Sequence, residues 1–171
     1  MNIISNIDWK IVSFINNNIK NKYLDFIMSK VTRLGDFGLI WNAISIVLII
    51  SKEYQSIGFK AVTALCLCIL LGEGILKYTI KRVRPFIINT DLKILINKPR
   101  SYSFPSGHTA SSVAVASILA IYFSQIAIVV FLLAFLISFS RVYLCVHYPS
   151  DVIIGAILGV ICANISLIIC R

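Results

Sequence analysis

Charged residues are scarce in this sequence. Asp, Glu, Lys and Arg make up 13% of its 171 residues, whereas they make up about a quarter of a typical soluble domain. Hydrophobic residues account for 58%, and several apolar runs approach or reach the roughly 20 residues that a helix needs to cross a bilayer. This composition excludes an ordinary soluble domain and predicts an integral membrane protein.

Acidic residues are few: the chain has 7 Asp and Glu against 16 Lys and Arg, for a net charge of +9. A basic balance can indicate a nucleic-acid partner, but no stretch interleaves basic with aromatic residues, so we expect no nucleic acid. Lys and Arg beside membrane spans meet anionic lipid headgroups. An alternative is that the cations crowd one functional surface.

Ligands for a metal ion are also few. The two histidines, His108 and His147, share their surroundings with Lys and Arg, and only Glu73, Asp91 and Asp151 could add carboxylates. Fixed positive charge would repel a divalent cation. The five cysteines lie in apolar stretches, where a free thiol behaves as a small apolar residue. We therefore expect no metal, no disulfide and no cofactor.

Residues 1–36 are predicted to form two amphipathic helices: the first should lie in the headgroup plane of the membrane, and the second should lie at the surface or pack against the bundle. Apolar side chains of residues 3–15 recur at spacings of three and four, the helical pattern, with Asp8 among the polar positions. No basic segment followed by an apolar stretch opens the chain, so we expect no cleavable signal peptide. Residues 22–34 repeat the helical pattern and should end at Gly35. The polar residues expected to face away are Asp25, Ser29, Lys30, Thr32 and Arg33.

Residues 37–171 are predicted to form a single all-α bundle of five or six membrane spans. Glu73 and Lys77, one turn apart at the end of one apolar run, should attract each other. Residues 81–104 form the longest polar stretch, and loops held by a rigid frame often carry function. The predicted spans cover residues 37–50, 57–80, 109–123, 126–140 and 152–170.

Three polar clusters flank these spans: Lys77 to Pro85, Pro105 to His108, and Ser140 to Asp151. Consecutive spans alternate in direction. The end of the second span, the start of the third, the end of the fourth and the start of the fifth therefore lie on one face. The sequence predicts that all three clusters meet there and form one site.

The third cluster combines an imidazole with a carboxylate. Pro149 suits the first position of a helix, which places Asp151 in the first turn of the last span. A carboxylate there can orient an imidazole, as in a catalytic triad. His147 is then a candidate nucleophile that would form a phosphohistidine, and His108 would protonate the leaving oxygen. Alternatively, His147 and Asp151 form a structural hydrogen-bonded pair.

The cations of the clusters fit a phosphate group. Lys77, Arg84 and Arg141 come from different segments, and guanidinium and ammonium groups both bind phosphate oxygens. Ser106 and Gly107 stand at a helix start, where free N–H groups and the helix dipole favour an anion. Taken singly, each cation is an ordinary charge beside a span and Ser106 is an ordinary helix cap. Taken together with two histidines, they predict phosphoryl transfer.

These residues resemble the three-part signature of the type 2 phosphatidic acid phosphatase superfamily, membrane lipid phosphatases related to vanadium haloperoxidases. The signature is Lys, six residues, Arg-Pro; then Pro-Ser-Gly-His; then Ser-Arg, five residues, His, three residues, Asp. The resemblance implies that His147 is the nucleophile, Asp151 its partner, and His108 the acid that later activates water. It also implies a metal-free reaction in which the phosphate is held by Lys77, Arg84, Ser106, Gly107 and Arg141.

The resemblance further implies a substrate and a location. Small bacterial members of this size act on undecaprenyl diphosphate or on phosphatidylglycerophosphate, so we expect undecaprenyl diphosphate, with phosphatidylglycerophosphate or phosphatidate as alternatives. The site should face the extracytoplasmic side of the plasma membrane. Counted alone, the Lys and Arg residues favour the opposite orientation, because they are denser on the site's face than on the face with Lys52, Lys60 and Arg171.

Two other classes compete with an enzyme. A transporter would be expected to carry ionisable residues deep in its spans, but Glu73 and Lys77 lie at the end of theirs. A catalytically silent family member would not need His108, His147 and Asp151, and all three are present.

Overall fold

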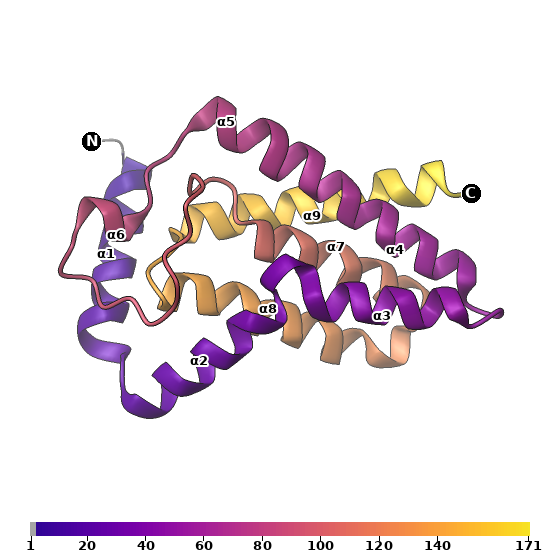
Figure 1. Ribbon diagram of the computed structural model, residues 1–171, viewed down its shortest axis with the longest axis horizontal. Helices are drawn as coiled ribbons and strands as arrows, with labels where there is room; N and C mark the ends of the chain where they lie inside the picture. Colours follow the sequence, from indigo (N-terminus) through magenta and orange to yellow (C-terminus); the bar gives the residue numbers. More distant parts are fainter. Residues whose placement is uncertain (1–2) are drawn as a thin grey trace.

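The computed structural model describes residues 3–171, which form helices and loops with no β-strand. Figure 1 shows an elongated bundle with α1 and α6 at one end and the C-terminus at the other. A π-helical segment, Ile69–Leu76, joins α4 to α5, and another, Ile15–Ile19, extends α1. The helices are α1 (Ile3–Phe14), α2 (Lys22–Leu34), α3 (Leu39–Ile50), α4 (Gln55–Cys68), α5 (Lys77–Ile80), α6 (Pro85–Ile88), α7 (Gly107–Tyr122), α8 (Ala127–Tyr143) and α9 (Pro149–Ile169).

Local sequence explains where the helices around the clusters begin. The Ser106 side chain accepts from the Thr109 N–H and caps α7, which satisfies a backbone donor that the helix leaves free. Pro149 occupies the first turn of α9, and the Asp151 carboxylate accepts from the Tyr148 N–H. The predicted place of Asp151 in the first turn of the last long helix is confirmed.

Helix α7 lies at the centre of the bundle and packs against α4, α8 and α9. Small residues allow this close approach. A Cβ added at Gly155 would lie 2.7 Å from the Ser106 carbonyl oxygen, and one at Gly159 would lie 2.5 Å from the Ala110 carbonyl oxygen. Glycines four residues apart are a common contact between helices in membranes, and here they hold the start of α7 beside the start of α9.

The two N-terminal helices form as predicted, and α2 ends at Leu34, directly before Gly35. The assignment of Thr32 to an outward face was wrong, because its side chain is buried and accepts a hydrogen bond from Arg141. Asp8 is not a surface residue of α1 either, since it is 2% exposed and forms an ion pair with Arg82. A buried polar group needs such a partner, and the periodicity of a single helix does not show one.

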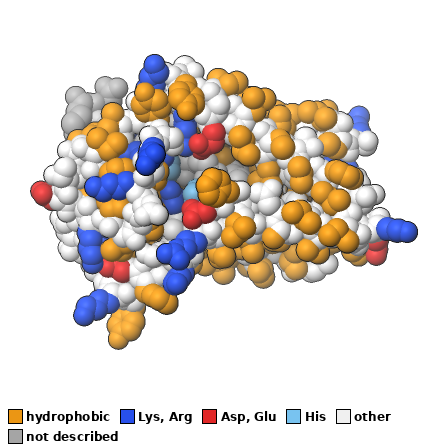
Figure 2. Space-filling model, in the orientation of Figure 1, with side chains coloured by type: hydrophobic (Ala, Val, Ile, Leu, Met, Phe, Trp, Pro, Cys, Tyr) orange, Lys and Arg blue, Asp and Glu red, His pale blue; other side chains and the backbone are white. Residues whose placement is uncertain are grey.

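Within residues 3–171, three helical stretches are long and apolar enough to cross a membrane: Gln55–Ile88, Ser124–Tyr143 and Pro149–Ile169. The pair Lys22–Leu34 and Asp36–Ile50, bent by 47°, would make a fourth. Figure 2 shows hydrophobic side chains covering the body of the bundle, whereas most Lys and Arg side chains on this face gather at the end that carries α1. Five or six spans stay a prediction.

Candidate active site

The three polar clusters meet at one cavity of about 1140 Å³ at the cation-rich end of the bundle. Figure 2 shows the histidines at the bottom of this hollow, between Lys, Arg and acidic side chains. Ser106 and Asp151 do not line the cavity, and both are fully buried behind it. The predicted site residues that line the cavity are Lys77, Arg84, Gly107, His108, Arg141 and His147.

His147 lies in the connection between α8 and α9 and is 2% exposed. Its Nε2 atom is 3.1 Å from Arg84 Nη1. Because a guanidinium can only donate, Nε2 accepts this hydrogen bond, and the neutral ring carries its proton on Nδ1. That proton faces Asp151 Oδ2, but the separation is 3.6 Å, too long for a hydrogen bond. The structure therefore assigns the tautomer through Arg84, with Asp151 as a nearby charge.

Burial lowers the pKa of His147 well below its ordinary value, and the neighbouring Arg84 and Arg141 lower it further. The Asp151 carboxylate acts in the opposite direction. The ring is consequently neutral at neutral pH. A neutral imidazole with its lone pair on Nε2 is the form that can act as a nucleophile.

Asp151 is held on both of its oxygens. Oδ1 is 2.6 Å from Arg82 Nη1, whereas Oδ2 accepts from the Ser103 hydroxyl and, at 2.9 Å, from the Tyr148 N–H. Sequence reasoning missed Arg82 and the contact of Ser103. Arg82 stands two residues before Arg84 in a loop with many cations, so nothing in the sequence distinguished it from its neighbours.

Arg84 has a protein partner for every N–H group of its guanidinium. Nε donates to the Ser101 carbonyl, Nη1 to the Val146 carbonyl and to His147, and Nη2 to the Tyr102 carbonyl and the Ser101 hydroxyl. In this state Arg84 ties the polar loop to the connection that holds His147. Its predicted role in phosphate binding stays a prediction, and it requires that some of these partners be exchanged for phosphate oxygens.

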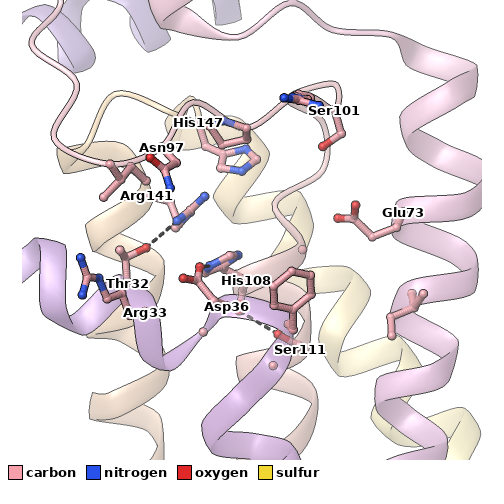
Figure 3. Close-up of a pocket in the computed structure, with 18 of the residues that line it drawn as sticks. Thr32, Arg33, Asp36, Glu73, Asn97, Ser101, His108, Ser111, Arg141 and His147 are labelled. Atoms are coloured by element: carbon pink, nitrogen blue, oxygen red, sulfur yellow. Dashed lines mark hydrogen bonds and ion pairs between the residues drawn. The ribbon is translucent and has the colours of Figure 1, made fainter.

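Lys77 and Arg141 approach the cavity from opposite sides. Lys77 Nζ is 2.6 Å from Glu73, which confirms the predicted pair, and 3.1 Å from the Ser101 hydroxyl. Arg141 Nη1 donates to Thr32, whereas its Nε is buried and has no hydrogen-bond partner within residues 3–171. Figure 3 shows Glu73 on the side of the cavity opposite the Arg141 guanidinium. A buried donor without a partner is costly, and the role of Arg141 in phosphate binding stays a prediction.

His108, in the first turn of α7, pairs with a residue that the sequence did not single out. Its Nε2 is 2.9 Å from Asp36 Oδ1, and Figure 3 shows the two side chains together below Arg141. Asp36 stands at the bend between α2 and α3, where Phe37 and Gly38 both have positive φ, 52° and 66°. The bend places the Asp36 carboxylate beside the His108 ring. No local pattern in the sequence predicts this contact across 72 residues.

Ser106 and Gly107 form the helix start beside the cavity. The Ser106 hydroxyl accepts from Thr109, as a cap does, so the reading as a structural cap is confirmed for Ser106. Gly107 faces the Glu73 carboxylate so closely that no side chain fits between them. Glu73 thus lies beside the first residue of α7, near the place where the sequence predicted a bound anion.

The fold and the site together define a class: an all-helical, largely apolar protein with a cluster of two histidines, a carboxylate and several buried cations at one end. Comparison with known proteins gives the family. The sequence profile of the PAP2 superfamily matches residues 58–170, which is more than half of the chain, and this chain belongs to that superfamily. The resemblance inferred from the three polar clusters is confirmed.

Similar curated proteins are named as phosphatases. An undecaprenyl-diphosphatase of Sulfolobus acidocaldarius is 36% identical over 121 residues, and this match covers 70% of the present chain and 58% of the relative. A lipid A 4'-phosphatase of Bacteroides thetaiotaomicron is 31% identical over 170 residues, covering 91% of the chain and 73% of the relative. The chain therefore spans little more than half the length of the first of these relatives.

Solved structures have the same fold. The crystal structure of Aquifex aeolicus LpxE has a TM-score of 0.82 and 32% identity, and the match covers 98% of this chain and 99% of that one. The phosphatidylglycerolphosphate phosphatase of Bacillus subtilis has a TM-score of 0.79 and 27% identity, with 97% and 85% covered.

Proposed function

We propose that this protein is a membrane lipid phosphatase that transfers a phosphoryl group from a lipid to His147 and then to water. The observation that carries the proposal is the neutral His147 ring, with its Nε2 lone pair at the cavity and Asp151 behind its Nδ1 proton. The family and the names of the relatives support the same reaction class.

In the first step, His147 Nε2 attacks the terminal phosphorus, and the bond from that phosphorus to the bridging oxygen of a diphosphate, or to the ester oxygen of a monoester, breaks. Arg84 must turn from Nε2 to a phosphate oxygen for this attack, and Arg141 Nε gains the partner that it lacks. His108 gives a proton to the leaving oxygen. Asp151 stabilises the positive charge that the ring acquires when its Nε2 becomes bonded to phosphorus.

In the second step, His108 takes a proton from water, and the resulting hydroxide attacks the phosphohistidine. The bond from phosphorus to Nε2 breaks, which releases inorganic phosphate and restores the neutral ring. Fixed cations balance the negative charge that moves between oxygens in both steps, so charge stabilisation is preorganised. This reaction needs no metal ion, because the cationic side chains take the place that a divalent cation has in other phosphatases.

For the substrate, we propose a polyprenyl diphosphate, undecaprenyl diphosphate, with phosphatidylglycerophosphate or phosphatidate as the alternatives. The undecaprenyl-diphosphatase relative supports this choice. Two exposed arginines, Arg33 and Arg100, also line the cavity and could meet a second phosphoryl group. We place the protein in the plasma membrane with the site on the extracytoplasmic face.

The experiment is a phosphate-release assay on the purified protein in detergent, with a chelator present. Undecaprenyl diphosphate, phosphatidylglycerophosphate and phosphatidate would be compared beside the His147→Ala variant. We expect chelator-resistant release, fastest from the diphosphate, and none from the variant. Loss of activity with the chelator would refute the metal-free reaction, and full activity of His147→Ala would refute its role as nucleophile.

A further inference from the structure

Arg82 bridges two carboxylates that come from distant parts of the chain. Its Nη1 is 2.6 Å from Asp151 Oδ1 and 2.7 Å from the Ser150 hydroxyl, and its Nη2 is 2.6 Å from Asp8 Oδ2. Asp151 stands beside the proposed nucleophile, whereas Asp8 belongs to the N-terminal helix α1. One guanidinium thus connects α1 to the site.

Asp8 also contacts the start of α9 directly. Its Oδ1 accepts from the Ser150 N–H at 3.0 Å, and its Oδ2 accepts from the Ser150 hydroxyl. Around these contacts the Tyr148 ring is enclosed: the Arg82 guanidinium lies 4.0 Å from its centroid, and the Trp9 ring packs edge-on at 5.5 Å. Helix α1 therefore packs against the segment that runs from His147 to Asp151 and forms hydrogen bonds with it.

Burial shows what Asp8 contributes to this network. The Asp8 and Asp151 side chains are 3% and 0% exposed, whereas the Arg82 side chain is 23% exposed. Two buried carboxylates share one cation that has a path to solvent. Removing one anionic partner would leave Arg82 freer to swing outward, and Asp151 would lose the group that fixes its Oδ1. In a buried network every member must be satisfied for its geometry to be specified.

We propose that Asp8 is a positioning residue for the phosphoryl transfer: it acts through Arg82 to hold the Asp151 charge beside the Nδ1 side of His147. The inference rests on the proposed role of His147. It makes α1 part of the active-site structure, whereas the amphipathic pattern alone predicted a helix that rests on the membrane surface.

A second ion pair in the same region provides the matched control. Asp25 of α2 is 3.0 Å from Lys93 of the polar loop and also accepts from the Tyr143 hydroxyl. Like Asp8, it is a carboxylate that ties an N-terminal helix to the loop. Unlike Asp8, it has no contact with Arg82, Asp151 or His147 among its hydrogen bonds and ion pairs in residues 3–171.

The test compares kcat and KM for phosphate release by the wild type and the variants Asp8→Asn, Arg82→Gln and Asp25→Asn in detergent. We expect Asp8→Asn to lower kcat about ten-fold with KM changed by less than about two-fold, because positioning acts on the reacting ring. Asp25→Asn should stay within about two-fold of the wild type in both. The double variant Asp8→Asn/Arg82→Gln should be no slower than Arg82→Gln alone, since both changes act through one connection.

The pH profile of kcat/KM separates positioning from general damage. Arg82→Gln removes a positive charge beside Asp151, so protonation of His147 becomes easier and the acid limb should move to higher pH. In Asp8→Asn the released Arg82 moves away from Asp151, so the acid limb should move in the same direction, by less because the negative charge of Asp8 is lost as well. The groups that face His147 directly are unchanged in both variants: Asp151, Arg84 and Arg141. A variant that only loses structure would lose activity without such a shift of the acid limb.

Apparent melting temperatures are measured for every variant. If Asp8→Asn does not fold, Arg82→Lys carries the test, because an ammonium keeps the charge but cannot bridge two carboxylates as a guanidinium fork does; we expect the same loss of kcat. If the wild type is active but the kcat of Asp8→Asn, or of Arg82→Lys in its place, equals that of Asp25→Asn, the inference is wrong and the proposed function is unaffected. A wild type that releases no phosphate from any of the three lipids overturns the proposed function, and the inference with it.

Discussion

The two histidines of the site each have a carboxylate, but the two pairs differ in kind. Asp151 is fully buried, and its distance from His147 is 3.6 Å. Asp36 is half-exposed and bonds His108 at 2.9 Å. A fixed charge behind a buried ring suits a nucleophile, which becomes positively charged in the reaction. An exposed partner suits a ring that must exchange protons with a leaving group and with water.

Replacing Asp36 tests this division of roles. We expect Asp36→Asn to lower kcat about ten-fold for phosphatidate, whose leaving group is an alkoxide, because an amide does not stabilise the protonated His108 ring that acts as the acid. The loss should shrink to less than about three-fold with a p-nitrophenyl phosphate ester, whose leaving group needs no proton. Release rates with the two substrates provide the measurement. Equal losses with both would contradict the assignment of His108 as the acid.

The pKa of His147 makes a prediction about stability. Burial lowers this pKa below the ordinary value of about 6.5. As pH falls through that value, the unfolded chain binds a proton that the folded protein does not, so the free energy of unfolding decreases. We expect the apparent melting temperature in detergent to fall between pH 7 and 5, and to fall less in His147→Gln. An unchanged slope in the variant would contradict the prediction.

At the scale of elements, the contact between α7 and α9 positions the helix start at Ser106 beside the helix start at Pro149. The Ser106 N–H donates to the Asp151 carbonyl at 3.0 Å. Gly155 and Gly159 allow the two helices to approach this closely. The second and third polar clusters are therefore held together by backbone contact, in addition to their side chains.

A methyl group at Gly159 tests this contact. The added Cβ would lie 2.5 Å from the Ala110 carbonyl oxygen and 3.0 Å from the Ala114 nitrogen, and both are backbone atoms that cannot rotate away. We expect Gly159→Ala to destabilise the protein by about 1–3 kcal/mol, the usual cost of overpacking. Gly74→Ala is the control, because its Cβ would lie 3.7 Å from the nearest atom considered. The melting temperatures of both variants are measured by thermal unfolding in detergent. Equal values would contradict the prediction that Gly159→Ala is the less stable variant.

At the scale of the whole molecule, charge is distributed unequally between the two ends of the bundle. On the face shown in Figure 2, most Lys and Arg side chains lie at the end that carries the site. Several of them are committed to protein contacts: Lys77 to Glu73, Arg82 to Asp8 and Asp151. A rule that counts cations in loops as orienting charges therefore overstates the charge available at this end. The charge count is therefore a weaker argument against the orientation that the family resemblance implies.

Accessibility from the two sides of the membrane tests that orientation. The turn between α3 and α4 and the C-terminus lie at the same end of the bundle (Figure 1). We expect a protease site inserted between Lys52 and Glu53, and a reporter fused after Arg171, to be accessible only from the cytoplasm. A protease site inserted beside Lys98 should be cut only from outside. The opposite pattern would place the site in the cytoplasm.

The sequence by itself determined the helices, the order of the polar clusters and their convergence. These follow from local causes: the spacing of apolar residues, Ser106 as a cap, Pro149 at a helix start, and the alternating direction of spans. The partners of individual charges depend on the tertiary structure. Asp36 reaches His108 across 72 residues, and Asp8 reaches Arg82 across 74. Such contacts arise from how helices pack and bend, because a buried charge selects the partner that packing brings near, and no local pattern encodes that choice.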